Sequence, residues 1–305
     1  MRTKITGTQF ALLLLLSRMC SLFIFTPVFN SVQTSTAMLV GNLVSMTIQI
    51  LILIPISMFW NKNPNVSILD YLLSKNKIIS KIIIFSFLGF FIFQAINTLF
   101  HFEFFLSNTA YPKVSALPII LLITICCVYT AKLGIEGICR GGFIIFFIFL
   151  IGLISIFALT MKYFDILNIK PIVLEPAKLI FESTIKNFSR NSELLLLLIF
   201  APNVKSSMTK CSLKYIIITG AIFEIITFVM QGVLGEYLMK QTFPFYALST
   251  ISGAKILGRL DAVQMTLWII LSFVRITIFL LAANICFKKL RKKEAKSNFS
   301  IYIIA

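Results

Sequence analysis

Two stretches of this chain share a pattern that decides the fold class. Residues 12–27 read LLLLLSRMCSLFIFTP and residues 194–202 read LLLLLIFAP, so each has a leucine run, a less regular stretch and a proline, Pro27 or Pro202. Many transporters consist of two inverted repeats, with binding sites where corresponding helices are broken. The spacing of the two stretches predicts a five-plus-five repeat with discontinuous first and sixth helices. Coincidence is the alternative, because leucine runs and prolines are common in membrane spans.

The composition of the whole chain places both stretches in a membrane. Of its 305 residues, 58% are hydrophobic and 13% are charged, and the mean hydropathy is +0.96. An average soluble domain carries about 25% charged residues, so an ordinary water-soluble enzyme is excluded. A helix crosses a bilayer with roughly 20 apolar residues. An all-α polytopic membrane protein is therefore expected, with eight spans at 10–29, 37–60, 78–100, 114–131, 141–161, 189–204, 213–238 and 261–287.

The lysines and arginines predict how these spans are oriented. Cytoplasmic loops of membrane proteins carry an excess of basic residues. If the N-terminus is cytoplasmic, 17 of the 28 basic residues fall in cytoplasmic segments and 9 in external ones. This topology accounts for most of the net charge of +17, so no nucleic-acid partner is expected. Residues 288–305 form a basic cytoplasmic tail that is suited to anionic membrane lipid.

Charged residues inside the spans mark the candidate site. A charged side chain inside a membrane costs several kcal/mol unless it is paired or solvated. The spans contain two arginines, Arg18 and Arg275, and two glutamates, Glu193 and Glu224, and mutual neutralisation of these charges is one interpretation. If Arg18 instead lines a cavity, its guanidinium can hold a carboxylate through two hydrogen bonds. The N-terminal end of a half-helix can hold the same group. We expect a ligand site at mid-depth between the first, third, sixth and eighth spans, formed by Ser17, Arg18, Cys20, Ser21, Asn97, Glu193 and Arg275. Glu224, the fourth charged residue, is more typical of a structural partner.

The remaining features predict structure rather than chemistry. Asn42, Gln49 and Thr277 are expected to form hydrogen bonds between helices. Residues 162–190 are expected to form a long external loop, and residues 243–258 a short amphipathic helix along the outer surface. The single histidine and the lack of a catalytic, metal or nucleotide motif predict no enzyme activity and no cofactor.

Several segments resemble a known family. FPFYALSTISGAKILGRLDAVQMTLWIILSFVRITIFLLAA, residues 243–283, is similar to the permease-like B subunit of spore germinant receptors, where Arg275 falls at a basic position of the family pattern. AKLGIEGICR at 131–140 resembles the family's R-x-G-x-E-x-x-A-R linker. SELLLLLIFAPNVK at 192–205 resembles its sixth helix, and TGTQFALLLLLSRMCSLFIFTP at 6–27 lies where its first helix is found.

The resemblance implies a fold and a function. The family belongs to the amino acid–polyamine–organocation superfamily, with ten helices of the LeuT type. Its members bind a small germinant, often an amino acid, and act with an A-type subunit and a C-type lipoprotein subunit in the inner spore membrane. The N-terminus is expected to be cytoplasmic. Residues 1–287 would form the permease-like domain, with a first repeat at about 9–161 and an incomplete second repeat at about 189–287.

The chain departs from the family pattern in two places. Ser17-Arg18-Met19-Cys20-Ser21 stands where the family usually has a G-x-G-like break, and the chain ends at SNFSIYIIA where the family continues for two more helices. Eight of the usual ten helices are therefore expected. Two alternatives stay open: an ion-coupled secondary transporter of amino acids, and a C-terminally truncated copy without function.

Overall fold

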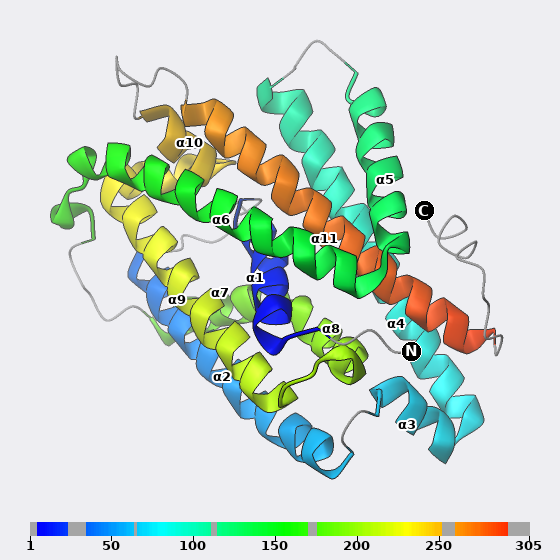
Figure 1. The fold of residues 1–305 in the computed structure, drawn as a ribbon. Coiled ribbons are helices and arrows are strands. Elements are labelled where there is room, and N and C mark those ends of the chain that lie inside the picture. The colour runs from blue at the N-terminus through cyan, green and yellow to red at the C-terminus, as the bar shows by residue number, and fades with distance from the viewer. Residues whose placement is uncertain are drawn as a thin grey trace.

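The computed structural model describes residues 5–23, 35–63, 66–110, 115–169, 176–251 and 260–291, and helices dominate all of them (Figure 1). Within these residues the β-structure is a single parallel bridge between Ile5 and Val204. Five helices are long and apolar enough to cross a membrane: α2 (Ser35–Lys62), α4 (Lys77–Phe105), α6 (Gly134–Thr160), α9 (Met208–Leu234) and α11 (Leu260–Leu290). The all-α, multi-pass membrane class that the sequence predicts is confirmed.

Two further helices are apolar but shorter than a typical span. They are α1 (Gly7–Phe23), with 17 residues, and α5 (Leu117–Lys132), with 16 residues. The structure thus gives five full-length candidates and two short apolar helices within the described residues, where the sequence predicted eight spans. The α1 helix overlaps the predicted span 10–29 and α5 overlaps the predicted span 114–131; residues 24–29 and 114 of these spans lie outside the described part of the chain.

The helix α11 forms the centre of the fold. It packs against α4, α1, α6 and α5, and Figure 1 shows it running through the middle of the molecule between α6 and α4. The most hydrophobic window of α11 is 78% buried, compared with 28% for the windows of α4 and α6. Large side chains such as Trp268 and Phe279 are fully enclosed, whereas Ile144 on α6 and Phe85 on α4 face outward. Outward apolar side chains suit contact with lipid tails.

The first helix is not broken at residues 17–21, which corrects the expectation from the sequence. The α1 helix runs without interruption from Gly7 through Arg18 to Phe23. The polar side chains find partners without unwinding the backbone, since the Arg18 guanidinium donates to Ser21 Oγ (2.8 Å) within the same helix. Ser21 Oγ in turn donates to the Arg18 carbonyl oxygen at 2.7 Å. Polar residues therefore need not interrupt a helix when they can bond to its own turns.

The predicted sixth span, 189–204, is not a spanning helix. The described chain forms α8 (Glu193–Phe200) followed by one 3-10 turn, η4 (Ala201–Asn203). Pro202 lies in that turn, and a proline cannot donate to a continuing helix. Eight helical residues are too few to cross a bilayer. The short element is consistent with a discontinuous sixth helix, although the break does not mirror one in the described part of α1.

Residues 162–190 contain a helix where a loop was expected. The α7 helix (Ala177–Ser189) begins after Pro176 and packs along α2, beside α9 (Figure 1). Gly41 of α2 allows this close approach, because a Cβ atom there would lie 2.5 Å from Ser183 Oγ. Small residues commonly let helices approach in membrane proteins. The loop therefore contributes a packed wall to the interior.

The remaining elements are short. They are α3 (Ile68–Lys75), α10 (Pro244–Ile251), the π-helical turn η1 (Leu106–Ala110) and the 3-10 turns η2 (Met161–Tyr163), η3 (Ile166–Ile169) and η5 (Gly235–Lys240). The helix predicted near 243–258 exists as α10, but Phe245 and Leu248 are fully buried and it packs on α11 and α9. It does not lie along the outer surface as expected. Residues 252–259 lie outside the described residues.

Candidate functional site

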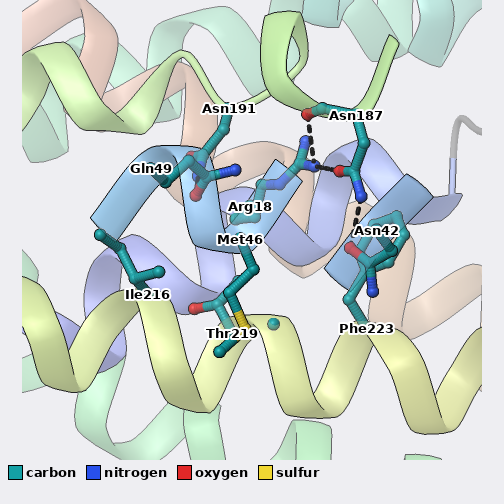
Figure 2. A pocket seen from close by; sticks show the side chains of 10 residues that line it. Arg18, Asn42, Met46, Gln49, Asn187, Asn191, Ile216, Thr219 and Phe223 are labelled. Carbon is teal, nitrogen blue, oxygen red and sulfur yellow. Dashed lines mark hydrogen bonds between the residues drawn. The ribbon is translucent and has the colours of Figure 1, made fainter. Parts of the chain in front are cut away.

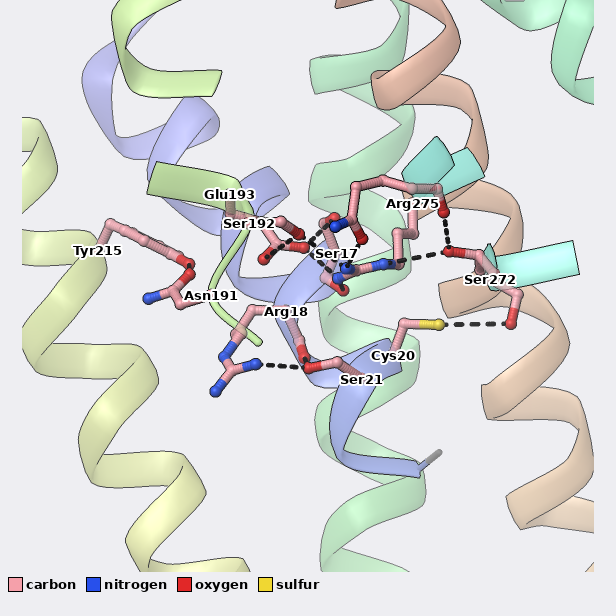
Figure 3. A network of polar contacts seen from close by, with 12 residues as sticks. Ser17, Arg18, Cys20, Ser21, Asn191, Ser192, Glu193, Tyr215, Ser272 and Arg275 are labelled. Carbon is pink, nitrogen blue, oxygen red and sulfur yellow. Dashed lines mark hydrogen bonds and ion pairs between the residues drawn. The ribbon is translucent and has the colours of Figure 1, made fainter. Parts of the chain in front are cut away.

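A buried ion pair joins α11 to the start of α8. The Arg275 guanidinium donates through Nη1 to the Glu193 carboxylate, and the exposed fractions of the two side chains are 5% and 0%. Ser17 of α1 completes the cluster, because its hydroxyl donates to Glu193 Oε1 at 2.8 Å and its carbonyl oxygen accepts from Arg275 Nη1 at 3.0 Å. Figure 3 shows these three residues at the centre of the polar network. Three helices therefore meet at one pair of opposite charges.

The Arg275 guanidinium has no donor left for a ligand. Its Nε donates to Thr98 Oγ1 at 3.2 Å, and its Nη2 donates to Ser192 Oγ at 2.8 Å and to Gln94 Oε1 at 3.3 Å. A guanidinium has five N–H donors, and with the two bonds from Nη1 all five are used. The mutual neutralisation considered from the sequence is thus real for Arg275 and Glu193. This cluster holds helices together.

Arg18 has a different environment, although it is 2% exposed. Its Nη1 donates to Ser21, and its Nη2 donates to the Asn187 side chain (2.5 Å) and to the Asn187 carbonyl oxygen (3.2 Å). These bonds use three of the five donors of the guanidinium. None of the described acidic residues lies within ion-pair distance of Arg18. The guanidinium carbon of Arg18 lies over the ring of Phe223, 5.2 Å from the ring centroid. Arg18 is therefore a buried cation without a direct counter-ion in the described structure.

A relay of two asparagines connects Arg18 to Glu224. Asn187 on α7 accepts from Arg18 and donates through Nδ2 to Asn42 Oδ1 on α2. Asn42 then donates through its own Nδ2 to the Glu224 carboxylate on α9. Figure 2 shows the contacts of Arg18 with Asn187 and of Asn187 with Asn42. The relay orients both amides and crosses four helices, so Arg18 and Glu224 are coupled without touching.

A small cavity lies between Arg18 and α9 (Figure 2). Its free space is about 20 Å³, which is room for about one water molecule. Thr219 is 4% exposed, and its hydroxyl has no hydrogen-bond partner among the described residues. Ligand pockets for drug-sized molecules measure about 300–1,000 Å³, so this cavity is nearly closed. Its lining combines amide, hydroxyl and apolar groups: Arg18, Asn42, Met46, Gln49, Asn187, Asn191, Ile216, Thr219, Gly220 and Phe223.

Asn191 fixes the turn that separates α7 from α8. Its Nδ2 donates to Gln49 Oε1 on α2 at 2.7 Å, and its Oδ1 accepts from the Tyr215 hydroxyl on α9 at 2.5 Å. Gln49 also donates to Ser45 Oγ at 3.1 Å. The turn is therefore held between α2 and α9, next to the cavity. The expectation that Asn42 and Gln49 bond between helices is confirmed, whereas Thr277 bonds to Phe273 within its own helix.

The structure divides the residues predicted for one site into two groups. Ser17, Glu193 and Arg275 form the ion-pair cluster, whereas Arg18 lines the cavity and is bonded to Ser21. Cys20 bonds to neither group; its Sγ lies 3.4 Å from Ser272 Oγ. Asn97 is not brought into either group: the α4 residues that reach Arg275 are Gln94 and Thr98.

Sequence reasoning missed several residues that complete the two groups. Asn187 lies in the segment that was expected to be a loop, Asn191 lies near the start of the predicted sixth span, and Thr219 is one hydroxyl in a long apolar helix. The signal that could have found the asparagines is their spacing of four residues, which would place both side chains on one face of a helix.

The fold and these two polar centres define a multi-pass membrane protein of permease-like type, with charges buried between its helices. The chain belongs to the family of spore germination proteins, since the model of that family matches residues 4–305, essentially the whole chain. The resemblance stated from the sequence is thereby confirmed. Among curated proteins, none matches the chain.

Proposed function

We propose that this protein is the permease-like subunit of a spore germinant receptor, and that it senses a small germinant such as an amino acid inside the membrane. The observation that carries the proposal is the state of Arg18. This cation is buried, points to a polar cavity, keeps two donors unused and has no carboxylate partner among the described residues. A carboxylate is the natural complement of a guanidinium with free donors.

The charges around the cavity favour an anionic ligand group. A second small cavity shares Asn187 and Phe223 with the first, and its lining includes Lys186 and Arg190. Positive potential along an approach path raises the local concentration of anions. The carboxylate end of the ligand would therefore lie at Arg18, and Thr219 would supply an oxygen to a polar hydrogen of the ligand.

The small volume of the cavity makes binding dependent on movement. An amino acid does not fit into about 20 Å³, so α1, α2, α7 or α9 must separate for it to enter. A ligand shifts a conformational equilibrium only when it binds one state more tightly than the other. Here the wider state alone has room for the ligand. The closed cavity therefore provides a physical basis for sensing.

We infer the finer features of the receptor from the same family. The LeuT-type inverted repeat is supported by the short α8 helix and by the contact of α1 with α8 through Ser17 and Glu193. The N-terminus would be cytoplasmic in the inner spore membrane, as the distribution of basic residues favours. The A-type subunit and the C-type lipoprotein would receive the conformational signal.

Direct binding tests this proposal. The purified protein is titrated with a panel of amino acids, together with Arg18→Gln, Arg18→Lys and the control Arg140→Gln, whose side chain is 73% exposed. We expect one or more amino acids to bind the wild type and the control, and binding to fall at least tenfold in both Arg18 variants. Thermal unfolding shows whether each variant is folded. A folded Arg18→Gln protein that binds like the wild type would refute the site.

Uptake separates the receptor from the transporter alternative. In proteoliposomes that contain this chain alone, a secondary transporter accumulates labelled amino acid, whereas a receptor subunit binds it without accumulation. A germination defect on deletion of the gene would in turn exclude a copy without function. Both results together define the role of the chain.

A further inference from the structure

A third and much roomier cavity lies where α1 and α9 begin. It is an open hollow of about 390 Å³ and shares no described lining residue with the Arg18 cavity. Residues 6–8 and the segment after α8 form its walls. The two strands of chain are held together where Ile5 and Val204 are bridged and Lys205 donates its backbone N–H to the Ile5 carbonyl oxygen at 2.9 Å. The lining consists of Thr6, Gly7, Thr8, Lys205, Ser206, Lys210, Cys211 and Lys214.

The cavity concentrates positive charge. Lys205, Lys210 and Lys214 are all exposed, and none of the described lining residues is acidic. None of the three ammonium groups makes an ion pair with a described residue; Lys214 donates to Thr8 Oγ1 at 3.4 Å. Three like charges in one hollow repel each other unless an anion lies between them. The charge therefore favours a negatively charged occupant.

Backbone donors add to this charge. Thr6 caps α1, because its Oγ1 accepts from the Gln9 N–H at 3.3 Å while Gln9 Oε1 accepts from the Thr6 hydroxyl at 3.0 Å. The N–H groups of Gly7 and Thr8 have no hydrogen-bond partner among the described residues, and both residues line the cavity. The α9 helix also begins here, at Met208, without a side-chain cap. Unpaired amides at helix starts bind anions.

Glycine at position 7 keeps these donors accessible. A Cβ atom on Gly7 would lie 2.1 Å from Ser206 Oγ and 3.4 Å from Cys211 Cβ. Any larger residue would push Ser206 away and disturb the wall formed by the 205–207 segment. The cavity thus depends on close contact between the start of α1 and the chain that enters α9.

The position of the cavity indicates where its occupant comes from. Its lysines lie before and within the first two turns of α9, a helix that is long and apolar enough to span the membrane. Cavities at the end of a span lie at the depth of lipid headgroups, and basic pockets there bind anionic headgroups. Lysine is a common ligand of phosphate groups, to which it contributes a point charge.

We propose that this cavity binds a phosphate group, with Lys205, Lys210 and Lys214 as its cationic ligands and the Gly7 and Thr8 amides as its backbone donors. The occupant would touch both α1 and the segment that follows α8. It would therefore link α1, which carries Ser17, to the chain that continues from α8, which carries Glu193. Its source is either the headgroup of an anionic phospholipid or soluble phosphate.

Thermal unfolding of the full chain tests the proposal and distinguishes the two sources. One arm compares inorganic phosphate with chloride at equal ionic strength in detergent. The other compares nanodiscs of phosphatidylcholine with and without phosphatidylglycerol. The test variant is Lys205→Gln/Lys210→Gln/Lys214→Gln, and the matched control is Lys75→Gln/Lys77→Gln/Lys81→Gln, which removes three exposed lysines elsewhere. A third variant replaces the three cavity lysines with arginine and so restores their charge.

We expect the wild type and the control to be stabilised, and the affinity for the stabilising probe to fall about a hundredfold in the test variant, at about 1 kcal/mol per lysine. The arginine variant should recover most of the affinity. Stabilisation by both probes supports a site for the phosphate group itself, and stabilisation by phosphatidylglycerol alone supports a headgroup site. The proposal is overturned if neither probe stabilises the wild type, or if the test and control variants lose equal affinity.

Discussion

Arg275 and Glu193 pair in the interior of the protein and so fix α11 against the start of α8, 82 residues apart in sequence. The pair also takes up the hydroxyl of Ser17, which brings α1 into the same cluster. Because every donor of Arg275 is used, this cluster is saturated. Arg18, one residue after Ser17, keeps unused donors and faces a cavity. The two arginines, which look alike in the sequence, thus have separate roles.

Removing Arg275 should destabilise the protein strongly. The Arg275→Met variant leaves Glu193 buried without a counter-charge, which costs about 3–5 kcal/mol. The double variant Arg275→Met/Glu193→Gln removes both charges and should recover part of this loss. Thermal unfolding in detergent measures both effects. The control is Lys289→Met, which breaks a partly exposed pair with Asp70 and should cost less than about 1 kcal/mol. An Arg275→Met protein as stable as the control would contradict this role.

The asparagine relay should stabilise the fold through Asn187. Replacing Asn187 with alanine removes an acceptor of Arg18 and a donor to Asn42, and hydrogen bonds to charged groups contribute about 1.5–3 kcal/mol. We expect a loss of that size in the free energy of unfolding. Asn108→Ala is a suitable control, since exposed Asn108 bonds only to Phe104 of its own helix in the described structure. Equal losses in the two variants would show that the relay has no special weight.

Glycine 41 should be needed for the contact between α2 and α7. A methyl group at this position would lie 2.5 Å from Ser183 Oγ and 3.1 Å from the backbone nitrogen of Thr184. Gly41→Ala should therefore lower the melting temperature. Gly89→Ala is the matched control, because nothing lies within 4 Å of a Cβ atom there and alanine favours a helix by about 1 kcal/mol. The prediction fails if Gly41→Ala melts at or above the melting temperature of the wild type, or at the same temperature as Gly89→Ala.

Thr219 should matter for the ligand and not for the fold. Its hydroxyl is buried without a partner among the described residues. Thr219→Val keeps the shape and removes that group, so the free energy of unfolding should stay constant or rise by about 1–3 kcal/mol. Affinity for the bound amino acid should fall several-fold. The pair of measurements is informative: a Thr219→Val protein that is much less stable would show that this hydroxyl has a structural partner.

The sequence predicted the membrane class and most of the helices because hydropathy reports them directly. The α2, α4, α9 and α11 helices lie where apolar runs were found. The α6 helix starts seven residues earlier than predicted, at Gly134, since Glu136 and Arg140 pair on its exposed surface and continue the helix. The charged residues in the first turns lower the local hydropathy, so the start of this helix was predicted too late.

The remaining differences come from contacts that a sequence pattern does not contain. The sequence of α7 is of mixed polarity and follows a proline, so its pattern is like that of a loop. The packing of α7 against α2, which the sequence pattern does not contain, accompanies its helical structure. Arg18 was expected to break α1, but Ser21 and Asn187 satisfy its guanidinium while the helix continues. Gln94 and Thr98, rather than Asn97, reach Arg275 from α4, and hydropathy does not say which face of α4 meets Arg275.

The central claim is that Arg18 receives the anionic group of the germinant, and a structure with a bound amino acid tests it most directly. The account predicts a widened cavity with the carboxylate about 3 Å from the Arg18 guanidinium and the Arg275–Glu193 pair intact. It is contradicted if the amino acid lies elsewhere while Arg18 keeps its contacts with Asn187 and Ser21 and the cavity stays closed.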